Sequence, residues 1–234
     1  RGRMSKPRVE PDTARSPLGH LMVILEMIKF SHTLFALPFA LLGMMLAARG
    51  ASVPGFPGWR TLLLILGCLV TARSAAMAYT RIADQDIDAP NPRTAGRALP
   101  AGLLGAAQVW AFVFVNATLF ILFAVLLGKA TGRLSPAVLA WLFAYSHAKR
   151  FTAGAHFWLG LSLSIAPVGA WVAVTGALSG APWLLAAAVL FWVAGFDLIY
   201  SLQDLDFDLK RGLHSLPARL GGRGALRLAA ACHV

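Results

Sequence analysis

The chain has 234 residues, of which 58% are hydrophobic and only 13% are charged, and its formal net charge is +11. This composition is too apolar for a soluble domain, and repeated apolar runs of about 20 residues are typical of membrane-spanning helices. The positive charge does not indicate nucleic-acid binding, because no basic module with interleaved aromatic residues accompanies it. The sequence therefore predicts an all-α fold, a polytopic transmembrane helical bundle.

Residues 1–17 are basic, contain several prolines and show no hydrophobic periodicity, so we expect a mobile cytoplasmic tail. The apolar run that follows is too long for the core of a cleavable signal peptide. Residues 18–234 are expected to form a single transmembrane domain. Two cysteines, Cys68 and Cys232, both in apolar surroundings, indicate neither a disulfide framework nor a metal site.

The first predicted span, residues 21–48, carries Lys29 and His32 and is expected to be kinked at Pro38. A lysine at membrane depth is costly, so Lys29 should face the protein interior or reach the membrane surface. His32 is interpreted as structural. Five further complete spans are predicted, at residues 59–82, 106–127, 136–146 (extending through His147 and Lys149), 157–175 and 183–202. Residues 224–234 are predicted to begin a seventh span.

Seven of the ten acidic residues lie in two short stretches, each where an apolar run gives way to a polar loop. Residues four apart share one face of a helix, so the outer two aspartates of the first stretch should point the same way and the middle one elsewhere. The second stretch repeats this spacing 120 residues later, which indicates an internal repeat. The first stretch contains Asp84, Asp86 and Asp88, with Arg73, Met77 and Thr80 behind them; the second contains Asp197, Tyr200, Asp204, Asp206 and Asp208.

Both aspartate clusters follow helix C-termini, where the helix dipole already disfavours negative charge, so we expect a cation between them. Paired carboxylates suit Mg²⁺, which keeps several waters and completes its shell with substrate phosphates. No Cys or His joins either cluster at ligand spacing, which argues against zinc. The alternative interpretation is that these are solvated loop charges at the ends of two spans. Basic residues near both clusters could hold phosphate oxygens: Arg81, Arg93, Arg97, Lys210 and Arg211.

Together these stretches resemble the motifs of the UbiA-type intramembrane aromatic prenyltransferase family, which is typified by 4-hydroxybenzoate polyprenyltransferase. The first stretch is similar to the family's Asn-x-x-x-Asp-x-x-x-Asp signature, with Thr80 in place of the asparagine, and the Arg-Thr-x-x-Arg-x-Leu-Pro loop follows at residues 93–100. Asp204 and Asp208 match its second Asp-x-x-x-Asp motif, and residues 215–221 match Ser-x-x-x-Arg-x-Gly. Residues 145–152 and 166–176 are similar to its Lys-Arg loop and fifth helix, so the likeness runs from about Lys29 to the C-terminus.

The resemblance implies transfer of a polyprenyl group from a polyprenyl diphosphate to an aromatic acid, with 4-hydroxybenzoate as the first choice and a naphthoquinone-type acid as the alternative, in ubiquinone or menaquinone biosynthesis. It implies Mg²⁺ as cofactor on Asp84, Asp88, Asp204 and Asp208. It also implies a fold of nine transmembrane helices, so the chain is expected to be truncated at its C-terminus, able to insert but weakly active or inactive. The remaining implied substrate-binding residues are Thr80, Arg93, Arg97, Lys149, Arg150, Asp197 and Tyr200; Lys149 and Arg150 could instead be topology anchors.

Most lysines and arginines outside the spans lie on the side of the tail and of both aspartate motifs. By the positive-inside rule, this side of the inner-membrane protein faces the cytoplasm. Basic residues at this surface also attract anionic lipid headgroups. Two other classes of membrane protein fit the sequence less well. A transporter would gather its charges at the membrane midplane and not at one surface. A phosphatidyltransferase of the CDP-alcohol class would show an Asp-Gly-x-x-Ala-Arg run, which this sequence lacks.

Overall fold

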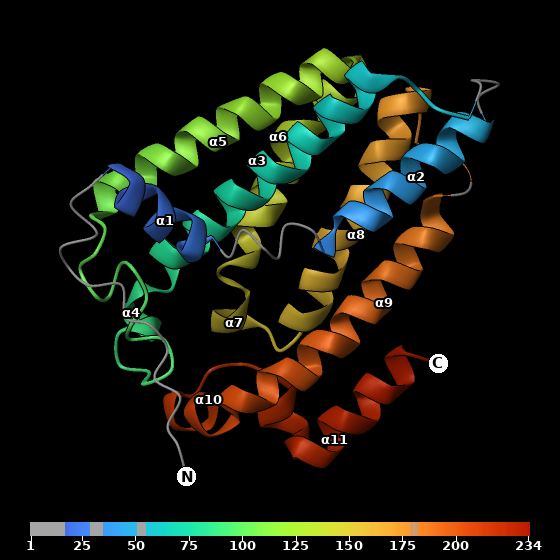
Figure 1. The fold of residues 1–234 in the computed structure, drawn as a ribbon. Helices are drawn as coiled ribbons and strands as arrows, with labels where there is room; N and C mark the ends of the chain where they lie inside the picture. The colour runs from blue at the N-terminus through green and yellow to red at the C-terminus, as the bar shows by residue number, and fades with distance from the viewer. Residues whose placement is uncertain (1–16, 29–34, 51–54, 179, 181) are drawn as a thin grey trace, which may run out of the picture.

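The computed structural model describes residues 17–28, 35–50, 55–178, 180 and 182–234, and within them every regular element is helical. In this part of the chain, eleven α-helices and the 3-10 turn η3 follow one another in sequence. Figure 1 shows their arrangement in space. Their bounds are α1 Pro17–Met27, α2 Leu37–Gly50, α3 Trp59–Ala83, α4 Gln85–Asp88, α5 Ala106–Leu127, α6 Lys129–Tyr145, α7 Ala148–Phe151, α8 Ala155–Thr175, α9 Pro182–Ser201, η3 Leu202–Asp204, α10 Leu205–Arg211 and α11 Leu216–Cys232.

Four helical segments in the described part of the chain are long and apolar enough to cross a membrane. They are α3, α5, α8 and the segment Pro182–Arg211, in which α9 continues through η3 into α10. Four predicted spans agree with α3, α5, α8 and α9 to within two residues at each end. These spans are 59–82, 106–127, 157–175 and 183–202. The expected all-helical membrane fold is confirmed.

The predicted first span is wrong as a single helix. α1 ends at Met27 and α2 begins at Leu37, and Phe35 and Ala36 form a short turn before α2. Pro38 does not kink a helix; it lies in the first turn of α2, where its missing N–H needs no partner. The predictions for Lys29 and His32 fall outside the described residues.

The fourth predicted span was placed too late, since α6 begins at Lys129 instead of 136. The apolar signal missed its first two turns because they contain polar residues. Pro136 lies inside this helix and cannot donate to the carbonyl of Gly132; the hydroxyl of Ser135 donates to it instead at 2.9 Å. At the other end, α6 stops at Tyr145 and does not extend through Lys149, which belongs to the separate short helix α7.

The helices form two groups that meet along α6 and α8 (Figure 1). α3 packs on α5 and α6, while α8 packs on α2 and α9. Glycines allow the closest approaches: a Cβ on Gly43 of α2 would lie 2.4 Å from the carbonyl oxygen of Pro167. One cluster of buried residues, including Ala78, Val109 and Val113, fills the space between α3 and α5.

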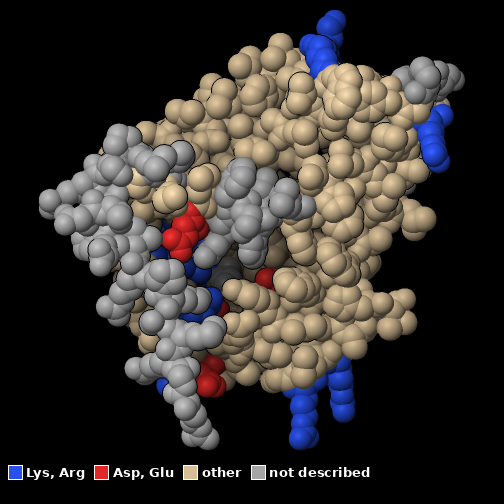
Figure 2. All heavy atoms as spheres, viewed as in Figure 1, with Lys and Arg blue, Asp and Glu red and all other residues tan. Residues whose placement is uncertain are grey.

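The short helices α4, α7 and α10 and the longer α11 all lie at one end of the molecule (Figure 1). Figure 2 shows that most of the visible face above this end carries no charged side chain, and that acidic and basic side chains gather around a hollow near it. This arrangement is that of a membrane protein whose polar chemistry is concentrated at one surface.

The predicted seventh span corresponds to α11, which begins at Leu216, eight residues earlier than expected, and contains non-helical backbone at Gly221 (φ 71°). One face of α11 packs on α9 through buried Ala225 and Ala229. Its opposite face carries Arg223 and Arg227, so this helix is strongly two-sided and is not one of the four apolar segments.

Candidate functional site

The first aspartate motif is built where the long helix α3 ends. Asp84 is the residue between α3 and α4, with φ −98° and ψ 7°, and its carbonyl accepts the N–H of Asp88 at 2.8 Å. Because the helix is interrupted at Asp84, the aspartates that follow have different surroundings. Asp88 is 5% exposed, whereas Asp86 is exposed to solvent. Asp86 and Asp88 therefore lie in different surroundings, as their spacing predicts.

The second motif repeats this design. Asp204 ends η3 and precedes α10 with φ −105° and ψ 3°, nearly the values at Asp84. Asp208 is 5% exposed, the same as Asp88, and Asp206 is exposed like Asp86. The internal repeat inferred from spacing is therefore present in the backbone and in the burial of each aspartate. The single helical face expected from Asp197 to Asp208 is absent, because the 3-10 turn η3 interrupts the α-helical spacing.

An arginine joins the two motifs. Arg93, in the loop after the first motif, donates from Nε to Oδ1 of Asp204 at 2.7 Å and from Nη2 to Oδ2 at 2.5 Å. This hydrogen-bonded carboxylate raises the pKa of the Arg93 guanidinium above its ordinary value, and Tyr200 contributes in the same direction. Residues 111 positions apart are thus held within the length of one side chain, as the predicted facing of the two motifs requires.

The loop that carries Arg93 is itself well held. The carboxylate of Asp88 accepts two hydrogen bonds from Nη1 of Arg97, at 2.6 and 2.5 Å, and its carbonyl accepts the hydroxyl of Thr94 at 3.0 Å. The side chain of Asn91 accepts the backbone N–H of Arg93 at 2.9 Å. Because Thr94 and Asn91 are buried, the loop presents its two arginines from a fixed backbone. Each arginine points at an aspartate of a motif, and not at solvent.

The donor set of these motifs fits Mg²⁺ in chemistry. Carboxylate oxygens are hard ligands, and Mg²⁺ in proteins is commonly held by one or two of them together with water and substrate phosphate. In the described part of the chain no three His, Cys, Asp or Glu side chains converge closely enough to form a protein-only cage. Two of the four motif aspartates are instead neutralised by Arg93 and Arg97.

Thr80, expected to contact substrate, is used between helices. Its hydroxyl donates to the carbonyl of Ala76 at 2.8 Å and lies 2.8 Å from the hydroxyl of Ser146, which is buried at the end of α6. This contact ties α3 to α6 one turn before Asp84. The structure brings Thr80 close to the first motif but gives its side chain a packing partner.

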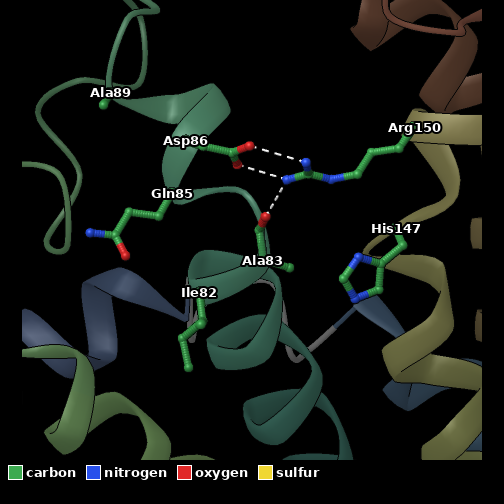
Figure 3. A pocket seen from close by; sticks show the side chains of 7 residues that line it. All are labelled: Ile82, Ala83, Gln85, Asp86, Ala89, His147 and Arg150. Carbon is green, nitrogen blue, oxygen red and sulfur yellow. Dashed lines mark hydrogen bonds and ion pairs between the residues drawn. The ribbon is translucent and has the colours of Figure 1, made fainter.

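Arg150 lies on the far side of the first motif, against the exposed aspartate. Its Nη1 and Nη2 donate to Asp86 at 3.0 and 2.7 Å, and Nη2 also donates to the carbonyl of Ala83 at 2.5 Å (Figure 3). This pair lowers the pKa of Asp86 and raises that of Arg150. The two residues border an open hollow of about 730 Å³ lined by Ile82, Ala83, Gln85, Asp86, Ala89, His147 and Arg150. The side chain of Lys149 lies outside what the structure describes.

Asp197 and Tyr200 occupy the last turns of α9. The carboxylate of Asp197 lies 2.7 Å from Nδ1 of His156, at the start of α8. Tyr200 is half exposed and stacks on Phe196, which is followed up α9 by Trp192 and Phe191. Tyr145, at the end of α6, lies within electrostatic range of both Asp197 and Asp84, so these residues surround a common region.

Two polar residues outside the predicted site have buried nitrogen atoms without a hydrogen-bond partner among the described residues. His156 is 1% exposed, and Arg73 has a buried Nε without a hydrogen-bond partner among the described residues. Their positions in apolar runs were the available signal, because an ionisable residue at membrane depth usually marks a functional site.

Comparison with known proteins gives one consistent result. The model of the UbiA prenyltransferase family matches residues 36–234. The 4-hydroxybenzoate octaprenyltransferases of Albidiferax ferrireducens and Acidovorax ebreus are 31% and 34% identical to this chain; the matches cover 90% and 89% of it and 71% of each relative.

Solved structures agree. The apo structure of a UbiA homolog from Aeropyrum pernix K1 shares 42% identity and a TM-score of 0.80, covering 87% of this chain and 74% of that one. A UbiA homolog from Archaeoglobus fulgidus bound to GPP and Mg²⁺, at 19% identity, has the same fold with a TM-score of 0.71 over 90% of this chain and 73% of that one.

The fold and these matches define a polytopic helical membrane enzyme. The chain belongs to the UbiA prenyltransferase family, and its activity is prenyl transfer. The resemblance inferred from its motifs is confirmed.

Proposed function

We propose that this enzyme transfers a polyprenyl group from polyprenyl diphosphate to an aromatic acid, with 4-hydroxybenzoate as the first acceptor to test. The observation that carries the proposal is the bidentate contact between Arg93 and Asp204, since it supports one head-group site formed by both motifs. The choice of acceptor is supported by the two relatives that are 4-hydroxybenzoate octaprenyltransferases.

Mg²⁺ would be held by Asp84, Asp88, Asp204 and Asp208, and when bound it would offset the negative charge that develops on the departing diphosphate. The structure of the Archaeoglobus fulgidus homolog with GPP and Mg²⁺ supports this assignment by analogy of fold. The carboxylates alone would repel a diphosphate, which is why the site needs positive charge before substrate enters.

Arg93 and Arg97 supply part of that charge. In the structure each guanidinium is paired with a motif carboxylate, and a guanidinium binds phosphate oxygens with the same forked geometry. We propose that both arginines exchange their aspartates for diphosphate oxygens when substrate binds. Fixed cationic groups at the leaving group lower the barrier to breaking the allylic C–O bond, because they need little reorganisation.

The apolar tail would extend along α9, where aromatic side chains lead away from the head-group site. Tyr200, Phe196 and Trp192 recur every four residues and are all substantially exposed. Phe35 stacks on Trp192 with ring centroids 5.0 Å apart, and Phe39 meets the same ring edge-on. Aromatic faces of this kind suit an isoprenoid chain and can also stabilise an allylic cation.

The acceptor is proposed to lie between these groups and the bundle interior. We infer that Asp197 takes the ring proton. Arg73, whose Nε is buried about three turns along α3 from Asp84, is a candidate to bind the acceptor carboxylate. Lys149 and Arg150 remain proposed as further diphosphate or carboxylate ligands. The basic loops around the motifs support their placement at the cytoplasmic surface of the inner membrane.

The test is a transfer assay with the purified chain in lipid nanodiscs. Polyprenyl diphosphate is supplied with 4-hydroxybenzoate or with a naphthoquinone-type acid, in Mg²⁺ or in EDTA, and prenylated acid is measured by chromatography. We expect Mg²⁺-dependent product with 4-hydroxybenzoate. Product with only the naphthoquinone-type acid would overturn the choice of acceptor, and no product with either acid would overturn the proposed function.

A further inference from the structure

His156 and Asp197 form an ion-pair contact between two membrane helices. Nδ1 of His156 lies 2.7 Å from Oδ2 of Asp197, and the histidine side chain is 2% exposed while that of the aspartate is 22% exposed. An ionised carboxylate only accepts hydrogen bonds, so Nδ1 carries the proton and Nε2 holds the lone pair when the imidazole is neutral. The contact therefore fixes the tautomer of the histidine.

Helix packing fixes where the imidazole can be. One turn further along α8, a Cβ on Gly160 would lie 2.3 Å from the carbonyl oxygen of Leu190, so α8 and α9 touch through their backbones there. Phe157, the residue directly after His156, contacts Phe191 of α9 edge-on. The backbone contact at Gly160 holds the start of α8 close to α9 and so keeps His156 near Asp197, whereas Phe157 adds side-chain packing beside it.

The second nitrogen of the ring shows how the histidine can act. Nε2 is buried and has no hydrogen-bond partner among the described residues. Buried polar groups are normally satisfied, so a purely structural histidine would be expected to have a partner here. Because Nε2 is also sealed from the surface, the imidazole cannot itself touch an acceptor and can act only through the open carboxylate of Asp197.

The surroundings of Asp197 indicate what it faces. It lies on α9 between the aromatic residues Phe196 and Tyr200, and within electrostatic range of Tyr145. Unlike Asp88 and Asp204, it has no arginine partner among the described ion pairs. It is thus a carboxylate oriented by an imidazole nitrogen, and not by a guanidinium as Asp88 and Asp204 are.

We propose that His156 is a positioning residue for Asp197 in the proton-removal step of prenyl transfer; this inference rests on the proposed function. A ring carbon of the acceptor forms a bond to C1 of the prenyl group, and the C1–O bond breaks with its electron pair leaving on diphosphate. The proton on that ring carbon passes to the carboxylate of Asp197, and the C–H electron pair restores the aromatic ring. The Nδ1–H of His156 holds the accepting oxygens toward the ring.

The test compares His156→Leu, His156→Asn and the packing control Phe157→Leu. Each is assayed with 4-hydroxybenzoate and with 4-hydroxybenzoate deuterated at the carbons beside the hydroxyl, and its unfolding temperature is measured. We expect His156→Leu to lower kcat by about tenfold to a hundredfold, with little change in KM for the diphosphate, and to enlarge the isotope effect because proton removal becomes limiting. The amide N–H of His156→Asn should restore most of the rate and reduce the isotope effect.

Phe157→Leu should leave the isotope effect at its wild-type value even if it lowers the unfolding temperature. Wild-type turnover in His156→Leu, or slower turnover with an unchanged isotope effect, would show that His156 serves packing alone. If His156→Leu does not fold, His156→Asn with a wild-type rate and Asp197→Asn with a large loss support the positioning role, whereas equal losses in both variants contradict it. Absence of transfer by the wild-type chain would overturn the proposed function and this inference with it.

Discussion

Arg93 donates hydrogen bonds to both carboxylate oxygens of Asp204, a residue 111 positions later in the sequence, with N···O distances of 2.7 and 2.5 Å. The contact unites two halves of a repeated design, because Asp204 has the same backbone conformation in its motif as Asp84 has in the other. This guanidinium links the loop after the first acidic motif to the second motif. It also marks the position at which we propose that the diphosphate binds.

The motif aspartates can be tested by isosteric substitution. Asp84→Asn and Asp204→Asn each remove a charged oxygen ligand with little change in volume, so we expect transfer to fall by at least about a hundredfold while the protein still inserts into the membrane. The measurement is product formation per unit of purified protein over a range of Mg²⁺ concentrations. Asp206→Asn is the matched control, since Asp206 is exposed in the same motif and should keep most of its activity. Full activity in Asp84→Asn or Asp204→Asn would rule out the four-aspartate metal site.

Arg93 and Arg97 should differ in their tolerance of lysine. Arg93 uses two nitrogens for Asp204, a geometry that a lysine cannot reproduce, whereas Arg97 reaches both oxygens of Asp88 from Nη1 alone. We therefore expect Arg93→Lys to raise KM for polyprenyl diphosphate about tenfold or more, and Arg97→Lys to raise it by clearly less. Steady-state kinetics with the acceptor at saturation checks this. Equal effects of the two substitutions would mean that the forked contact has no role in substrate binding.

Much of the fold was predictable because long apolar runs leave few alternatives in a membrane. α5 was placed to the residue, and α3, α8 and α9 to within two. Prediction failed at helix starts: Lys129 and Arg133 conceal the start of α6, and the kink expected at Pro38 is absent because this proline lies in the first turn of α2. Hydropathy cannot distinguish a helix-starting proline from a helix-bending one.

The site was predictable in outline but not in its pairings. Spacing indicated that Asp88 and Asp208 are equivalent, and both are buried to the same extent. Sequence could not show that Arg150 selects the exposed Asp86, because that choice depends on how α7 is placed against α4. His156 was missed for a similar reason, since its partner Asp197 is 41 residues away on another helix.

The structure gives Thr80 a role in helix packing that can be measured as stability. Thr80→Val keeps the shape of the side chain but removes the hydroxyl that lies 2.8 Å from Ser146, leaving a buried group with one partner fewer. We expect a loss of about 1–2 kcal/mol in the free energy of unfolding. Thr80→Asn can still bond to Ser146 through its amide and should preserve turnover, as the resemblance to the family's asparagine also predicts. Thermal unfolding in detergent together with the transfer assay separates the two effects; a Thr80→Val variant as stable as wild type would show that the contact contributes nothing.

The pair formed by Asp86 and Arg150 predicts a stability contribution with a defined pH dependence. Hydrogen bonding to Arg150 lowers the pKa of Asp86 below its ordinary value of 3.8, so the folded protein binds this proton less readily than the unfolded chain. The stabilisation is therefore complete above the ordinary pKa, decreases as the pH falls from 3.8 toward the lowered value, and is absent below it. Its size should be at most about 1 kcal/mol, because both side chains are substantially exposed to water and salt.

We expect Arg150→Gln to lower the unfolding temperature by a small, constant amount between pH 5 and pH 8, and by progressively less as the pH falls below the ordinary pKa of Asp86. Asp86→Asn should behave in the same way, and the double variant should lose no more than either single one, since they remove one shared contact. Unfolding temperatures of the four proteins across this range check the prediction. A difference that grows as the pH falls, or additive losses in the double variant, would show that the contact between α4 and α7 does not stabilise the folded protein.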